Sequence, residues 1–208
     1  MFTVTDIQEK RGIVILSVDG CARLKVRKNH FAKRPVEIGD EIDPEEYENA
    51  LAAIQFPDAY ESALTALDFS ARTAMEIERG LLAKGYVAPA AKAVVERLSE
   101  NRLIDDRRLA GRIAESNVKK PVGVYALKRK LRAKGISEED AEDALQALDE
   151  DQQRAAARQA AEKLYRRYQD LPSREARGKL SQALARRGFS WDAVRGAVDA
   201  LIDGDDYE

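Results

Sequence analysis

Residues 127–136 read LKRKLRAKGI: two leucines four residues apart, then a lysine, a glycine and an isoleucine. Leucines at this spacing lie on one face of an α-helix, and a cation followed by glycine is typical of the last turn of a helix, where glycine takes a left-handed conformation. The same pattern recurs in residues 84–86 (KGY) and 187–189 (RGF), which places the three glycines 50 and 53 residues apart. The sequence therefore predicts an internal repeat.

The surroundings of the three glycines match as well. Apolar residues stand eight and four positions before each glycine and six, ten and thirteen positions after it, as expected for two helices that bury one face each. A further helical stretch precedes each pattern, around residues 60–67, 109–114 and 155–168, and Ser137 and Ser190 are candidate N-caps for the helices that follow. We expect a mainly α fold of three tandem three-helix repeats, about nine helices in a curved array.

Residues 1–45 have a different periodicity. Residues 12–18 are rich in β-branched side chains, Asp19-Gly20 is a type I′ hairpin signal, and residues 22–27 alternate apolar and charged residues. Residues 2–7 complete a three-stranded meander. Because a lone hairpin is marginally stable, this small β-rich module requires the third strand or a helix packed against it.

The predicted domain organisation follows from these periods. Asp43-Pro44 is an N-cap followed by a proline at the first helical position, so the helical part begins there. We expect four parts along the chain: the N-terminal β-rich module 1–45, helical repeats 46–104 and 105–150, and a third repeat 151–208 that ends in an acidic tail.

Composition excludes several classes of protein. The 208 residues are 44% hydrophobic and 35% charged, and no stretch approaches the roughly 20 apolar residues needed to cross a membrane. The single cysteine, Cys21, cannot form an internal disulfide, and the single histidine, His30, argues against histidine-based catalysis and zinc sites. We expect an inert thiol, a loop or partly buried histidine, and a cytoplasmic protein that is not an enzyme and has no cofactor or metal.

Positive charge is concentrated although the net charge is only −2. Residues 117–137 and 20–36 contain no Asp or Glu, so local positive fields favour a polyanionic partner. The cations around residues 124–134 have no acid among them in the sequence, and those of the corresponding third-repeat helix have only Glu175. We therefore propose a DNA-binding track, against the alternative of a solvated charged face; its members are Lys119, Lys120, Lys128, Arg129, Lys130, Arg132, Lys134, Arg174, Arg177, Lys179, Arg186 and Arg187.

Other candidates have simpler structural interpretations. Tyr165 and Tyr168 are capable of stacking on bases, but core packing is the favoured role for aromatic residues near a helix end. Trp191 is expected to pack at the start of the last helix rather than to form an interface. Asp105-Asp106 is expected to cap a helix and complement its dipole rather than to bind a metal.

The N-terminal module has a positive strand face of its own. Arg23, Lys25 and Arg27 alternate with apolar residues, so all three lie on one face of the strand. That face is either a contact for polyanions or an ordinary solvated face, and we favour the second interpretation.

Residues 57–202 resemble the RecX family, regulators of the bacterial recombinase RecA. The resemblance rests on the order and spacing of several segments: residues 72–77 (RTAMEI), 84–86, 103–110 (LIDDRRLA), Gly123, Leu127, Leu131 and 134–136. Two dipeptides, Ser70-Ala71 and Asn101-Arg102, depart from the family pattern.

The resemblance implies a function. It implies a protein, expected to be a monomer, that lies in the groove of a RecA–single-stranded DNA filament, bridges RecA protomers, opposes filament growth and lowers ATPase and strand-exchange activity. It implies no cofactor and no catalytic residue. Two alternatives remain: a stand-alone helical DNA-binding module of helix-turn-helix type, and a carboxylate-dependent nuclease.

Overall fold

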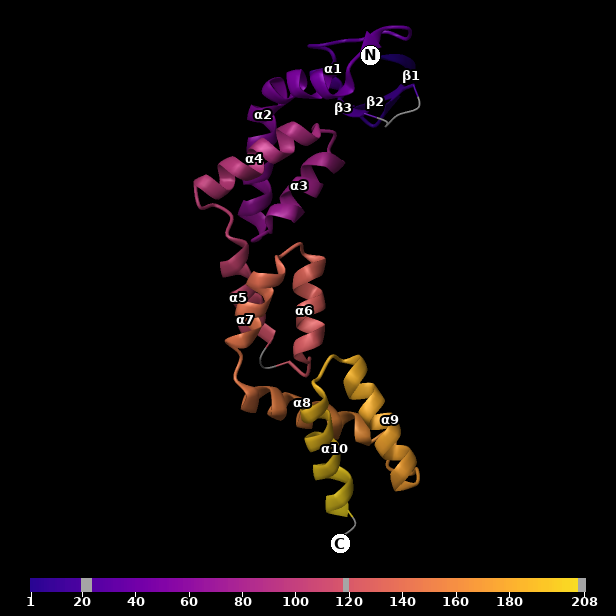
Figure 1. Ribbon diagram of the computed structural model, residues 1–208, viewed down its shortest axis with the longest axis vertical. Coiled ribbons are helices and arrows are strands. Elements are labelled where there is room, and N and C mark those ends of the chain that lie inside the picture. Colours follow the sequence, from indigo (N-terminus) through magenta and orange to yellow (C-terminus); the bar gives the residue numbers. More distant parts are fainter. Residues whose placement is uncertain (20–23, 118–119, 206–208) are drawn as a thin grey trace. The chain divides into compact units, whose positions relative to one another are not determined.

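The computed structural model describes residues 1–19, 24–117 and 120–205, without the side chains of residues 203–205. The chain divides into two compact units, Met1–Asp105 and Asp106–Glu208, here called unit 1 and unit 2 (Figure 1). Four strands, with one short helix between the third and the fourth, are followed by three groups of three helices, so the predicted fold class is confirmed. Within the described ranges there are ten helices rather than nine, because a four-residue helix, α1 (Lys28–Phe31), lies before the repeats.

Unit 1 begins with an antiparallel sheet in the order β3-β2-β1-β4. The strands are β1 (Phe2–Lys10), β2 (Ile13–Val18), β3 (Leu24–Arg27) and the short β4 (Glu41–Ile42). The three-stranded meander was predicted, and β4, which pairs with the start of β1, was not. The turn between β1 and β2 is formed by Arg11 (φ 51°) and Gly12 (φ 78°), both in the left-handed region as a type I′ turn requires. The hairpin predicted at Asp19-Gly20 includes Gly20, which lies outside the described residues.

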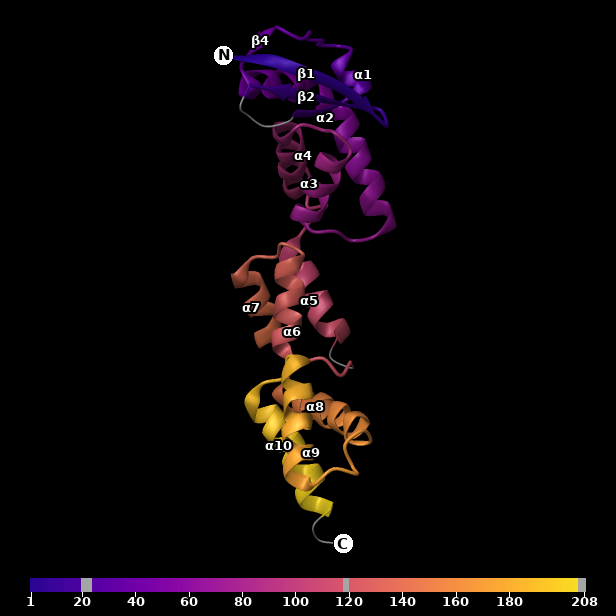
Figure 2. The same ribbon diagram turned by 90° about the vertical axis from the view of Figure 1, so that its right-hand side faces the viewer.

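A long helix completes the core beneath the sheet. Helix α2 (Pro44–Phe69) begins at the predicted N-cap, where the Asp43 side chain accepts a hydrogen bond of 2.9 Å from the Glu45 backbone N–H. Its first half packs Tyr47 and Leu51 against the strands, and Figure 2 shows β1 and β2 side by side with α1 and α2 next to them. Its second half packs against α3 (Ala74–Ala83) and α4 (Ala88–Glu100). The sheet and the first three-helix group therefore share one helix.

His30 lies in α1 and is fully buried. Its Nε2 atom is 2.8 Å from Asp58 Oδ2, and its ring centroid is 6.0 Å from that of Tyr86. The expectation of a loop or partly buried histidine was wrong, because α1 packs between β2, β3 and α2.

Unit 2 consists of two further three-helix groups. The second group is α5 (Asp106–Asn117), α6 (Val124–Ala133) and α7 (Glu138–Gln146), and the third is α8 (Glu150–Tyr165), α9 (Ser173–Arg186) and α10 (Trp191–Asp205). Each group has its own hydrophobic core. The apolar pairs four residues apart in the repeat pattern are buried in all three groups, as predicted: Ile77 and Leu81, Leu127 and Leu131, Leu180 and Leu184.

The three glycines of the repeat adopt the same left-handed conformation, with φ of 83° at Gly85, 81° at Gly135 and 80° at Gly188. Each glycine N–H donates to the carbonyl three residues earlier at 2.9–3.1 Å, and the next N–H donates to the carbonyl five residues earlier at 3.2–3.4 Å. These two bonds define a Schellman turn, so the predicted helix ends are confirmed. Ser137 and Ser190 accept hydrogen bonds from the backbone N–H three residues later, as predicted for N-caps.

Candidate nucleic-acid interface

Helix α6 carries four of the predicted DNA-binding cations, and a fifth, Lys134, is the residue that caps its end. Leu127 and Leu131 are buried in the core of the second group, which turns Arg129 and Lys130 toward solvent. A hydrophobic pair at i and i+4 fixes the orientation of such a short helix, because rotating it would expose both leucines. The buried pair of leucines therefore forms part of the core and also determines that Arg129 and Lys130 face solvent.

Two α6 cations are paired with acids of α7. Lys128 Nζ lies 2.9 Å from Glu142 Oε1 and also pairs with Glu138, while Arg132 Nε lies 2.7 Å from Glu138 Oε2. The prediction that these cations are uncompensated was wrong for Lys128 and Arg132. The sequence between residues 117 and 137 contains no acid, but the turn at Gly135 folds α7 back against α6 and supplies two.

The pairing shifts both partners in the direction that keeps them charged. The hydrogen bond to Glu138 raises the pKa of Lys128 above its ordinary value, and the hydrogen bond from Lys128 lowers the pKa of the Glu138 carboxyl. Both groups are therefore ionised at neutral pH, and they neutralise each other rather than attract a distant anion.

Other predicted cations remain available. Lys120, Arg129 and Lys130 are exposed and make no ion pair within the part of the chain that the structure describes. On α9, Arg177 pairs with Asp199 of α10, and Lys179 Nζ lies 2.7 Å from Glu175 Oε1. Predicted cations around α9 that are exposed and have no ion pair with a described residue are Arg174, Arg186 and Arg187. Lys134 is half-buried, and Lys119 lies outside the described residues.

The two cationic helices meet end to end within unit 2 (Figure 1). The Gly123 N–H, just before α6, donates to the Arg187 carbonyl at 3.1 Å, and the Tyr125 N–H donates to the Gly188 carbonyl at 2.9 Å. The first N–H groups of a helix have no carbonyl acceptor within that helix. Here the backbone carbonyls of the turn after α9 accept their hydrogen bonds. The structure therefore brings the exposed cations Arg186 and Arg187 to the start of the helix that carries Arg129 and Lys130.

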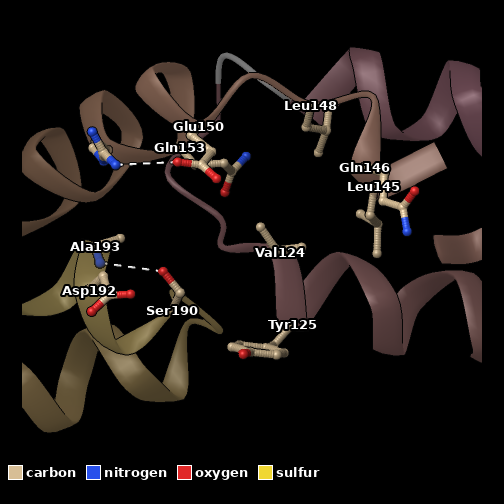
Figure 3. Close-up of a pocket in the computed structure, with 11 residues that line it drawn as sticks. Val124, Tyr125, Leu145, Gln146, Leu148, Glu150, Gln153, Ser190, Asp192 and Ala193 are labelled. Atoms are coloured by element: carbon tan, nitrogen blue, oxygen red, sulfur yellow. Dashed lines mark hydrogen bonds and ion pairs between the residues drawn. The ribbon is translucent and has the colours of Figure 1, made fainter. Parts of the chain in front are cut away.

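A groove of about 490 Å³ lies beside this junction. Figure 3 shows its lining, which comes from the start of α6, the end of α7 and the starts of α8 and α10. Val124, Leu145 and Leu148 provide apolar surface, and the charged groups are Glu150, Asp192 and Arg154, whose Nη2 lies 3.3 Å from Glu150 Oε2. The groove thus combines an apolar floor with a polar rim, which is the composition of many protein-binding sites.

Two aromatic side chains are exposed at the same junction. Tyr125, which lines the groove, is 56% exposed, and Trp191, between the lining residues Ser190 and Asp192, is 68% exposed. The prediction that Trp191 packs at the start of the last helix was wrong. Phe189, in the preceding turn, is buried in its place, and a side chain at the first helical position tilts toward the N-terminus, away from the core.

Sequence reasoning missed Tyr125, although a local signal exists. Position 125 is two residues before Leu127, which puts it on the opposite face of the helix from the buried leucines. It did not miss the two tyrosines near the end of α8: Tyr165 and Tyr168 pack against the core of the third group, as predicted.

The described part of the chain holds neither a cluster of metal-ligating side chains nor a membrane-spanning helix. Residues 1–19, 24–117 and 120–205 contain no group of three or more His, Cys, Asp or Glu side chains able to hold a metal ion. None of the helices described is long and apolar enough to span a bilayer.

Comparison with known sequences identifies the three helical groups. Sequence models described as the first, second and third three-helix domains of RecX match residues 59–98, 105–145 and 150–198. Regulatory protein RecX of Streptococcus sanguinis is 29% identical over 207 residues, which is 99% of this chain and 79% of that protein. Regulatory protein RecX of Streptococcus mutans is 28% identical over 200 residues, 95% of this chain and 76% of that protein.

Solved structures agree with the sequence comparison. A crystal structure of regulatory protein RecX superposes with a TM-score of 0.66 at 26% identity and covers 98% of this chain and 100% of that one. The crystal structure of RecX from Lactobacillus salivarius gives a TM-score of 0.66 at 28% identity over 72% of this chain and 97% of that one. The three helical groups match the three RecX domains in the same order, and the sequence similarity to RecX proteins covers nearly the whole chain. This protein therefore belongs to the RecX family of regulatory proteins.

Proposed function

We propose that this protein regulates RecA by binding the RecA–single-stranded DNA filament, and that it lowers filament extension, ATP hydrolysis and strand exchange. It does so by binding alone, without a catalytic residue or cofactor of its own. The observation that supports this proposal is the end-to-end junction of α6 and α9, which gathers exposed cations from two repeats. Membership of a family of regulatory proteins supports it independently.

The DNA-facing part of the proposal assigns phosphate contacts to cations that are exposed and not already paired. Arg129 and Lys130 on α6 and Arg186 and Arg187 at the end of α9 meet both conditions within the described residues. Lys128 and Arg132 contribute less, because a phosphate has to compete with Glu138 and Glu142 for them. Neutralising phosphates releases counterions from the strand, so binding through these residues is strongly salt-dependent.

The protein-facing part of the proposal assigns RecA contact to the groove beside the same junction. Exposed aromatic side chains next to an apolar groove are the usual centre of a protein interface, where they contribute most of the binding energy. Tyr125 and Trp191 are therefore proposed to contact RecA, with Glu150 and Asp192 at the polar rim. DNA and protein contacts then lie side by side, as a ligand of a nucleoprotein filament requires.

The experiment titrates this protein into a reaction in which its cognate RecA hydrolyses ATP on single-stranded DNA. Wild type is expected to lower ATP hydrolysis at substoichiometric ratios to RecA, which indicates action on filaments rather than competition for DNA. Arg129→Ala/Lys130→Ala should shift the inhibition curve to higher protein concentration and lower the salt slope of strand binding by about 1.4, because each phosphate contact contributes about 0.7.

The matched control removes two exposed cations elsewhere in unit 2. Lys163→Ala/Arg167→Ala makes the same change in net charge at the end of α8 and should leave both the inhibition curve and the salt slope unchanged. If the two double variants behave alike, the assigned DNA track is wrong. If wild type leaves ATP hydrolysis unchanged at every ratio, the proposed regulation of RecA is wrong; tight, sequence-selective binding of naked DNA would then favour a stand-alone DNA-binding module.

A further inference from the structure

Unit 1 contains a shallow depression of about 470 Å³ that is open to solvent, here called the cavity, and its charged lining is entirely positive. The cavity lies among the β1–β2 turn, β3, α2 and the turn that follows α3. Its polar side chains are Arg11, Arg27, Lys84, Ser62 and Tyr86, and no carboxylate lines it. Cations from three separate elements thus converge on one space.

None of these three cations is neutralised by a described acid. Arg11, Arg27 and Lys84 make no ion pair within residues 1–19, 24–117 and 120–205, whereas the neighbouring Lys28 pairs with Glu9 at 2.8 Å. Like charges around one cavity repel each other, and an anion placed among them removes that repulsion. The carboxylate of Asp58, whose backbone oxygen accepts a hydrogen bond from Tyr86, is bonded to His30 instead.

Neutral hydroxyl groups hold two of the cations in place. Arg27 Nη1 donates to Tyr86 Oη at 2.8 Å, Tyr86 Oη donates to the Asp58 carbonyl at 3.1 Å, and the guanidinium carbon lies 5.0 Å from the centroid of the Tyr86 ring. Lys84 Nζ donates to Ser62 Oγ at 2.6 Å. Neutral partners of this kind fix the conformation of a side chain without cancelling its charge. Binding a ligand therefore costs less side-chain conformational entropy.

The backbone fixes the walls of the cavity. The Arg27 N–H donates to the Gly85 carbonyl at 3.0 Å, and a Cβ at position 85 would lie 3.3 Å from both Arg27 N and Ile13 Cγ1. Arg11 occupies the left-handed region with φ of 51°, which is uncommon for a long side chain and places it in the type I′ turn at the cavity mouth. The turn at Gly85, which ends a helix in the repeat pattern, therefore also packs against Arg27 and Ile13 in the wall of the cavity.

We propose that this cavity binds a phosphate group. The tetrahedral oxygens of phosphate accept several donors at once, and the guanidinium groups of Arg11 and Arg27, the ammonium group of Lys84 and the hydroxyl group of Ser62 supply them here. The phosphate belongs either to the backbone of a single DNA strand or to a free nucleotide, and because the cavity is open to solvent, a phosphate that carries further groups can reach it. The assignment to a DNA strand rests on the proposed function; the affinity for phosphate itself does not.

The test uses the full-length protein with inorganic pyrophosphate and with a single-stranded oligonucleotide as separate probes. Arg11→Asn keeps a residue that tolerates the left-handed region, and Lys84→Gln keeps a donor for Ser62, so the double variant removes charge with little change in structure. It should weaken pyrophosphate binding in calorimetry by about a hundredfold, which is about tenfold for each of the two charge-assisted hydrogen bonds that are lost. It should also lower the salt slope of strand binding by about 1.4.

Arg79→Gln/Lys92→Gln, which removes two exposed cations of α3 and α4 outside the cavity, is the matched control and should change neither quantity. If Arg11→Asn/Lys84→Gln binds pyrophosphate as wild type does, the inference is wrong even where inhibition of RecA is observed. If pyrophosphate binding is lost and strand binding is unchanged, the site takes free nucleotides and the assignment to a strand is wrong. Loss of pyrophosphate binding in a protein whose wild type does not affect RecA supports the cavity and contradicts the proposed function.

Discussion

Gly123 and Gly188 lie where the backbones of the second and third three-helix groups come into close contact. Gly123 has φ of −83°, which any residue adopts, yet a Cβ there would overlap the backbone of Gly188 and Phe189. Gly188 has φ of 80°, and a Cβ there would overlap Ala126. The repeat pattern explains Gly188 as a helix-ending residue, whereas Gly123 is required only because another repeat lies against it.

We predict that Gly123→Ala destabilises unit 2 by about 2 kcal/mol or more, because the added methyl group forces the α6 start away from the α9 turn and breaks the bonds to Arg187 and Gly188. Gly188→Ala should cost more, since strain at positive φ is added. The measurement is urea unfolding followed by fluorescence of Trp191, the only tryptophan, which reports on unit 2.

Gly178→Ala provides the opposite expectation in the same unit. Gly178 lies inside α9, and the methyl group of an alanine there would meet nothing within 4 Å, so the substitution should stabilise the helix by up to about 1 kcal/mol. Equal effects of Gly123→Ala and Gly178→Ala on the unfolding midpoint would contradict the close contact between the repeats.

At the scale of elements, α6 and α7 are joined by charge as well as by their shared core. Because the pKa of Glu138 is lower in the folded protein, its stabilising effect is present above the ordinary carboxyl pKa of 4.5 and is lost as the pH falls through the lowered value. Because the pKa of Lys128 is raised, its effect is present below 10.5 and is lost as the pH rises through the raised value. The pair therefore stabilises unit 2 between about pH 5 and 10.

We predict that Glu138→Gln lowers the urea midpoint of unit 2 at pH 7 and has a smaller effect near pH 3, because the wild-type carboxyl loses its charge as the pH falls through its lowered pKa. The change also removes the partner of Arg132, so 1 M salt should reduce the difference at pH 7. Glu139→Gln is the control, since Glu139 makes no ion pair with a described residue. A Glu138→Gln effect of the same size at both pH values would mean that packing, not charge, is responsible.

The sequence predicts features that depend on neighbouring residues, such as helix ends, and does not predict contacts between helices. Helix ends such as Lys134-Gly135-Ile136 are specified within about ten residues, since the apolar pair, the cation and the glycine act on one local turn. The pairing of Lys128 with Glu138 and Glu142 joins two helices across a turn, so a count of charges along the chain missed it.

The candidate site follows the same division. Arg186 and Arg187 are identifiable from sequence as cations at a helix end, but their position at the start of α6 depends on packing between repeats. The cavity lined by Arg11, Arg27 and Lys84 draws on residues up to 73 positions apart, and only the fold brings them together.

At the scale of the whole molecule, each hydrophobic core lies within one unit. The cores of the sheet and first three-helix group draw on residues up to Ile104, and the other two draw on residues from Ala110 onward. Residues 1–105 and 106–208 are therefore each expected to fold when produced alone, with cooperative unfolding measured by circular dichroism.

The two units also carry separate proposed phosphate contacts, the cavity in unit 1 and the α6–α9 track in unit 2. When one unit is bound to a strand, the second binds intramolecularly, so the intact chain should bind a long single-stranded oligonucleotide at least about tenfold more tightly than either half. An equimolar mixture of the two halves should bind no better than the tighter half. Separating the chain after Asp105 keeps every phosphate contact but removes the increase in affinity that comes from linking the two units. Fluorescence anisotropy with a long and a very short oligonucleotide tests this, since only the long one can engage both units. An intact chain that matches the mixture on the long oligonucleotide would show that the units do not bind one strand together.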